Sequence, residues 1–136
     1  MSKNIDRLLK AAKEARDNAY APYSNFLVGA AVLSSSGKIF AGCNVENLSY
    51  GLTICAERNA IFRMVSEGDR EIEKIFIIGK TEEILPPCGA CRQVIAEFSG
   101  ENTAVYMSNK KGEWKKTSLI ELLPYTLSSL KAGKND

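Results

Sequence analysis

The chain has 136 residues, of which 45% are apolar and 25% are charged, and its formal net charge is +2. These values are typical of a soluble globular protein, and they argue against disorder, a membrane protein and a binder of nucleic acid or other polyanions. The length predicts one domain over residues 1–136, with a mobile tail from about residue 128. The N-terminus lacks an apolar signal core, so we expect a cytoplasmic location.

Apolar periodicity and turn residues divide the chain into alternating helices and strands. In chain order, the predicted elements are a helix over residues 5–19, strands over 27–33 and 38–42, a helix over 55–67, a strand over 72–79, a helix from 88 or 89 to 98, strands over 104–107 and 113–116, and a helix over 119–123. Asn4 is the candidate cap of the first helix, which should end before Pro22. Gly68 and Gly100 are expected to mark the ends of the next two helices.

The first predicted strand is apolar at every position from 27 to 33, which favours a strand covered on both faces. Residues 34–37 read as a turn, so the next strand should pair with the first as an antiparallel hairpin. Strands that alternate with helices predict an α/β protein, a three-layer α/β/α sandwich around one five-stranded mixed sheet. We find no internal repeat or linker.

Three of the four cysteines have the spacing of metal ligands. If a helix opens at Cys88, both Cys88 and Cys91 can reach one ion from its first turn, and Cys55 would supply a third sulfur. The chain contains no histidine, so imidazole ligands and Ser–His or Cys–His nucleophiles are excluded. Three protein ligands leave one position of Zn²⁺ open for water, which is typical of catalytic zinc.

Glu57 follows Cys55 by two residues and is the candidate proton carrier. Zinc lowers the pKa of its water toward roughly 7, and a hydrolytic site needs a proton acceptor. A carboxylate that then passes this proton to a ring nitrogen and to a leaving amine would complete a hydrolytic deamination. Arg58 is expected to hydrogen-bond a ligand sulfur and to offset the charge of three thiolates. The alternatives are a first-turn glutamate stabilised by the helix dipole and a solvated arginine.

Two segments carry a resemblance to the small homotetrameric cytidine deaminases: residues 55–60 (CAERNA) and 86–94 (PPCGACRQV). Residues 21–31, 42–47 and 121–124 are also similar, so the resemblance covers most of the chain. It implies one Zn²⁺ per subunit and a homotetramer. It further implies that cytidine and deoxycytidine, small-molecule nucleosides of pyrimidine salvage, are hydrolysed to the uridines with release of ammonia. The sequence does not rank the two substrates.

The same resemblance implies a set of substrate contacts. Asn44 and Glu46 would hydrogen-bond the ribose 3′-hydroxyl, whereas without the family they would read as turn residues. Phe26 would lie against the pyrimidine ring, the alternative being a plain core residue. The remaining implied positions are the backbone of Ala56 at the base, Tyr50 reaching a neighbouring subunit's pocket, and Gln93 beside the zinc with Arg58.

One segment departs from the family pattern. After Pro124 the family usually has Gly-Ala-Phe, whose phenylalanine enters a neighbouring subunit's pocket, whereas this chain has Tyr125, Thr126 and Leu127. Leu127 can cover the base but lacks aromatic stacking, typically worth about 0.5–1.5 kcal/mol, so affinity or base tolerance is expected to differ. Cys43 matches no ligand position and is expected to be a small buried hydrophobe.

Two other functions fit parts of the pattern. A deaminase of a modified cytosine nucleoside, such as blasticidin S, would share the zinc residues, but Asn44 and Glu46 argue for ordinary ribose recognition. A non-catalytic zinc-stabilised binding module would leave Glu57 and the open zinc position unused. Deaminases of polynucleotides are disfavoured, because the chain lacks the basic and aromatic surface that tracks single strands.

Overall fold

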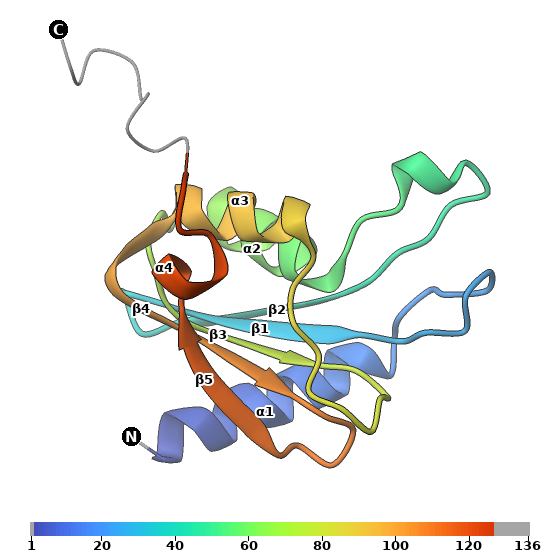
Figure 1. The fold of residues 1–136 in the computed structure, drawn as a ribbon, viewed down its shortest axis with the longest axis horizontal. Helices are drawn as coiled ribbons and strands as arrows, with labels where there is room; N and C mark the ends of the chain where they lie inside the picture. Colours follow the sequence, from blue (N-terminus) through green and yellow to red (C-terminus); the bar gives the residue numbers. More distant parts are fainter. Residues whose placement is uncertain (1, 127–136) are drawn as a thin grey trace, which may run out of the picture.

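The computed structural model describes residues 2–126, which form one five-stranded sheet with helices on both faces (Figure 1). In chain order the elements are α1 (Ser2–Arg16), β1 (Gly29–Ser34), β2 (Ile39–Cys43), the 3₁₀ helix η1 (Tyr50–Leu52), α2 (Ala56–Ser66), β3 (Ile72–Ile78), α3 (Gly89–Glu97), β4 (Ser99–Ser108), β5 (Trp114–Ser118) and α4 (Leu119–Leu122). The predicted α/β/α sandwich with a five-stranded mixed sheet is confirmed.

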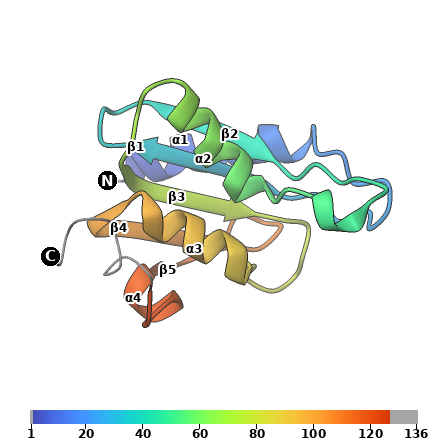
Figure 2. The same cartoon turned by 90° about the horizontal axis from the view of Figure 1, so that it is seen from above.

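The strand order in the sheet is β2-β1-β3-β4-β5. β1 pairs antiparallel with both β2 and β3, β4 pairs antiparallel with β5, and only β3 and β4 are parallel. Parallel neighbours require a crossover, and α3 provides it. This crossover lays α3 beside α2 on one face of the sheet, whereas α1 lies on the other (Figures 1 and 2). The predicted hairpin is the β1–β2 pair.

Side chains of β1 alternate between two apolar clusters. Ala30 and Val32 pack with residues of α2 and α3, and Ala31 and Leu33 pack with residues of α1. All six residues of β1 are buried. The apolar run therefore forms a strand covered on both faces from Gly29 onward, as its composition predicts, but residues 27 and 28 precede the strand.

The first helix differs from the prediction at both ends. It already includes Ser2, so Asn4 lies inside α1 and is not its cap. It ends at Arg16 and does not reach Ala19: Asn18 N and Ala19 N each donate to a carbonyl three residues back, and Tyr20 N then donates to Asn44 O at 3.0 Å. This contact with a distant segment competes successfully with the local helical pattern.

The fourth strand also differs, because it begins at Ser99, five residues before the predicted start. Gly100 therefore lies in β4 and does not end a helix. The polar residues around it fit no apolar strand pattern, but Thr103 Oγ1 accepts from Gly100 N at 2.8 Å and donates to Ile72 O at 2.6 Å. Leu127 and the predicted mobile tail, residues 128–136, lie outside the described residues.

Two glycines let helices approach the β1–β2 hairpin closely. A Cβ on Gly29 would lie 2.0 Å from Ala12 O in α1, and a Cβ on Gly42 would lie 2.5 Å from Ala60 N in α2. Both neighbours are backbone atoms, which cannot yield unless the helix moves. Glycine at these positions therefore sets how closely α1 and α2 pack on the sheet.

Replacing Gly29 tests this packing. Gly29→Ala should lower the free energy of unfolding by about 1–3 kcal/mol, because α1 must shift to admit one methyl group. Gly51→Ala is the control, since a Cβ there meets nothing within 4 Å, and it should change stability by less than about 0.5 kcal/mol. Urea denaturation followed by circular dichroism measures both variants. Coincident curves for the two would contradict the close approach of α1.

Candidate metal centre and substrate pocket

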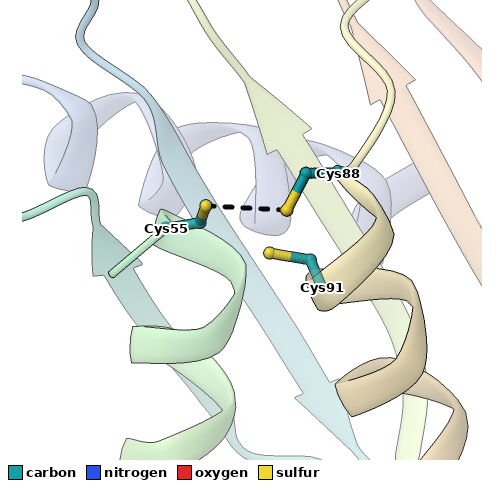
Figure 3. Close-up of side chains that lie close together, drawn as sticks. All are labelled: Cys55, Cys88 and Cys91. Carbon is teal, nitrogen blue, oxygen red and sulfur yellow. Dashed lines mark hydrogen bonds between the residues drawn. The ribbon is translucent and has the colours of Figure 1, made fainter. Parts of the chain in front are cut away.

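The three predicted ligand cysteines meet where two helices begin. Cys55 is the N-cap residue of α2, Cys88 is the N-cap residue of α3, and Cys91 lies in the first turn of α3. Figure 3 shows the three sulfurs pointing toward one another. They all lie within 4.8 Å of one another, and the Sγ atoms of Cys55 and Cys88 are 3.8 Å apart.

This cluster fits a tetrahedral zinc ion. Bonds of about 2.3 Å at tetrahedral angles place two ligand sulfurs roughly 3.8 Å apart, and Cys55 and Cys88 have this separation. Within residues 2–126, no other group of three cysteine, aspartate or glutamate side chains is arranged to hold a metal ion. Cys43 is not part of the cluster, and it is half-buried, so the expectation of a buried side chain is only partly met.

The surroundings of the sulfurs favour negative charge. Two helix N-termini face the cluster, and their dipoles stabilise thiolates. Arg58 Nη2 donates to Cys55 Sγ at 3.5 Å. Hydrogen bonds from Cys91, Arg58 and Cys88 hold the pKa of the Cys55 thiol well below its ordinary value. The pKa of the Cys91 thiol is raised, because Cys91 donates to Cys55 and is buried. Metal ligands bind as thiolates, so a divalent ion would favour ionisation of all three thiols.

Glu57 lies beside this cluster in a small pocket. Glu57 is only 4% exposed, and burial raises the pKa of its carboxyl to about 7. A pocket of about 170 Å³ has walls formed by Phe26, Val28, Asn44, Thr53, Cys55, Ala56, Glu57, Leu85, Pro86 and Cys88. The arrangement therefore places a carboxyl group that exchanges protons near neutral pH in the same pocket as two ligand sulfurs.

A second pocket, of about 200 Å³, adjoins the first and is lined by Tyr23, Ser24, Glu46, Tyr50 and Thr53. Thr53 lines both pockets, so they are neighbours. Glu46 accepts hydrogen bonds from the backbone N–H groups of Tyr23 at 3.0 Å and Ser24 at 3.2 Å, and from the Ser24 hydroxyl. The Ser24 hydroxyl is the main cause of a lowered pKa of Glu46, which keeps this carboxylate charged.

Asn44 forms part of the wall of the first pocket. Its Oδ1 accepts from Val28 N at 2.9 Å, and its Nδ2 donates to Phe26 O at 2.8 Å. The residue is 8% exposed, so little of its amide faces solvent. Asn44 therefore fixes the backbone that presents Phe26, whose own side chain also lines the pocket.

The other predicted contacts differ in burial and in whether they line a pocket. Ala56 is buried and lines the first pocket. Tyr50 is 73% exposed at the tip of η1, with its ring centroid 5.8 Å from that of Tyr23. Gln93 is half-buried in α3, and Leu127 is outside the described residues. Sequence reasoning missed Thr53, because a lone threonine between η1 and α2 carries no motif.

Comparisons with known proteins identify the family. Residues 2–108 match a family model described as the cytidine and deoxycytidylate deaminase zinc-binding region. The chain is 46% identical to a cytidine deaminase of Sporosarcina psychrophila over 125 residues, 92% of each protein, and 50% identical to one of Halalkalibacterium halodurans over 117 residues, 86% of this chain and 89% of that protein. A cytidine deaminase crystal structure from Burkholderia pseudomallei matches with a TM-score of 0.85 at 48% identity, over 89% of this chain and 97% of that one. The chain therefore belongs to the cytidine and deoxycytidylate deaminase family.

Proposed function

We propose that the protein catalyses the zinc-dependent hydrolytic deamination of cytidine and deoxycytidine to uridine and deoxyuridine, with release of ammonia. The observation that carries this proposal is that Glu57 lines one pocket with two of the three clustered cysteines, Cys55 and Cys88. When bound by Cys55, Cys88 and Cys91, zinc supplies the Lewis-acid chemistry that makes hydroxide available from water at neutral pH. Two relatives named above, from Sporosarcina psychrophila and Halalkalibacterium halodurans, are called cytidine deaminases.

Glu57 handles the protons of this reaction. Its carboxylate takes one proton from the attacking water and delivers it to the ring nitrogen of cytosine. It then takes the proton of the hydroxyl group now on C4 and delivers it to the departing amine, as the C4 carbonyl forms and the C–N bond breaks. One water is consumed and one ammonia is released, so the carboxylate ends in its starting state. A carboxyl pKa of about 7 suits a group that must both accept and donate at neutral pH.

Arg58 and Gln93 support the ligand set. The bond from Arg58 Nη2 to Cys55 Sγ withdraws charge from the sulfur and holds the ligand in place. Arg58 Nε is buried without a hydrogen-bond partner among the described residues, so the guanidinium has a further donor in this region. Gln93, two residues after Cys91 in α3, is assigned the same supporting role.

The two adjoining pockets suit the two halves of a nucleoside. The base occupies the pocket beside Glu57, with Phe26 along its ring and the backbone of Ala56 at its edge. The ribose extends toward the second pocket, and its 3′-hydroxyl is bound by Glu46 from that pocket and by Asn44 from the wall of the first. The charged state of Glu46 supports this assignment, because a carboxylate accepts a hydroxyl hydrogen bond strongly.

We further propose one catalytic domain that assembles as a homotetramer in the cytoplasm and serves pyrimidine salvage. Leu48, Tyr50 and Leu52 are 79%, 73% and 64% exposed, and assembly would cover this apolar segment and bring Tyr50 to a neighbouring pocket. A reducing compartment keeps the three thiols available for metal. Among the described residues, no helix has the length and apolar character needed to cross a membrane.

A substrate panel tests the proposed activity. Cytidine and deoxycytidine should lose their ultraviolet absorbance on incubation with the protein, and Glu57→Gln should lower the rate by about 10²–10⁴-fold at unchanged zinc content, because the proton carrier is removed. The control is Glu67→Gln, which alters an exposed carboxylate after α2 that pairs with Arg63. Turnover of blasticidin S alone would favour the modified-nucleoside deaminase, and full activity of Glu57→Gln would contradict the mechanism.

The ribose assignment has its own test. The wild type should prefer cytidine over 3′-deoxycytidine by roughly 10- to 150-fold in kcat/KM, as expected for a hydrogen bond to a charged group worth about 1.5–3 kcal/mol. In Glu46→Gln this preference should shrink, because the 3′-hydroxyl no longer has a charged hydrogen-bond partner. The comparison within each variant cancels any general loosening of the loop. An unchanged preference in Glu46→Gln would contradict contact with the 3′-hydroxyl.

A further inference from the structure

Cys88 is the least enclosed of the three clustered cysteines. It is exposed, whereas Cys55 is half-buried and Cys91 is buried. Packing cannot hold an exposed side chain in one place, so the position of the Cys88 sulfur depends on the backbone at the start of α3. The side chain of the preceding residue, Pro87, is fully buried, so packing fixes the position of the peptide that leads into Cys88.

Arg92, in α3, donates hydrogen bonds to this backbone. Its main-chain N donates to Cys88 O at 3.0 Å, and its Nε donates to Pro87 O at 2.9 Å. One residue therefore binds the two consecutive carbonyl groups on either side of the Cys88 Cα. The guanidinium is planar with fixed N–H directions, so the bond from Nε to Pro87 O constrains orientation as well as distance.

The same guanidinium reaches a second element. Arg92 Nη1 donates to Leu122 O at 3.0 Å. Leu122 belongs to α4, whose four residues leave its last carbonyl groups without partners inside the helix. Leu119 and Leu122 pack against the apolar cluster beneath α2 and α3, so α4 is anchored to the core. Both views place α4 beside α3 (Figures 1 and 2).

We propose that Arg92 is a positioning residue for the metal centre, which fixes the Pro87–Cys88 peptide against α4 and thereby holds the Cys88 sulfur toward the other two ligands. This role rests on the proposed zinc chemistry. Arg92 acts through the ligand backbone, in contrast to Arg58, which donates to a ligand sulfur directly.

The test measures zinc affinity by competition with a chromogenic chelator in Arg92→Gln, Arg92→Lys and Arg70→Gln. A second measurement records the thiolate charge-transfer band of each protein after Co²⁺ replaces zinc. Arg70 is the matched control, because its Nη1 donates to Val65 O at 2.8 Å and Asp69 O at 3.1 Å, beyond the opposite end of α2 from the sulfurs. Arg92→Lys keeps a single charged donor, and it serves as the deciding variant should Arg92→Gln fold poorly.

Arg92→Gln should bind zinc about 10- to 100-fold more weakly than the wild type and should have an altered Co²⁺ band. The zinc affinity of Arg92→Lys should lie between those of Arg92→Gln and the wild type. Arg70→Gln should have the affinity and the spectrum of the wild type. Wild-type affinity and spectrum in both Arg92 variants, with only a lower thermal midpoint, would overturn the proposal and leave Arg92 a stabilising role alone. A wild-type protein without zinc would instead overturn the proposed function itself.

Discussion

The convergence of two helix N-termini on one small volume is the constraint on which the site depends. Cys55 and Cys88 occupy the cap positions of α2 and α3, and Cys91 follows within the first turn of α3. The crossover between the parallel strands β3 and β4 lays α3 beside α2, and the missing side chain of Gly42 lets α2 settle onto β2. Two helix dipoles and Arg58 then stabilise thiolates that would otherwise repel one another.

Local patterns were enough to predict much of this arrangement. The apolar run of β1, the following turn and the strand–helix alternation predict the hairpin and the α/β/α layers, and the spacing of Cys88 and Cys91 predicts two ligands on one turn. Contacts between distant segments were not predictable in this way. Tyr20, just after the predicted helix, pairs with Asn44, and polar Thr103 joins β4 by binding Ile72 O. The strand order likewise depends on pairing between segments far apart in the chain.

The walls of the substrate pocket show why some residues carry two interpretations from sequence. Asn44 bonds the backbone of Phe26 and Val28, and Glu46 bonds the backbone of Tyr23 and Ser24. These are the loop-fixing contacts typical of turn residues. Both side chains also line the adjoining pockets. The structural and the substrate-binding interpretations are therefore compatible, because a side chain that shapes a pocket can also face its ligand.

In this site one zinc ion is held by three sulfur atoms, with one position left for a lighter ligand. X-ray absorption at the zinc edge of the purified protein measures this ligand set directly. We expect three sulfur neighbours at about 2.3 Å and one oxygen or nitrogen neighbour at about 2.0–2.2 Å. A shell of four sulfurs, or one made mainly of oxygen, would contradict it.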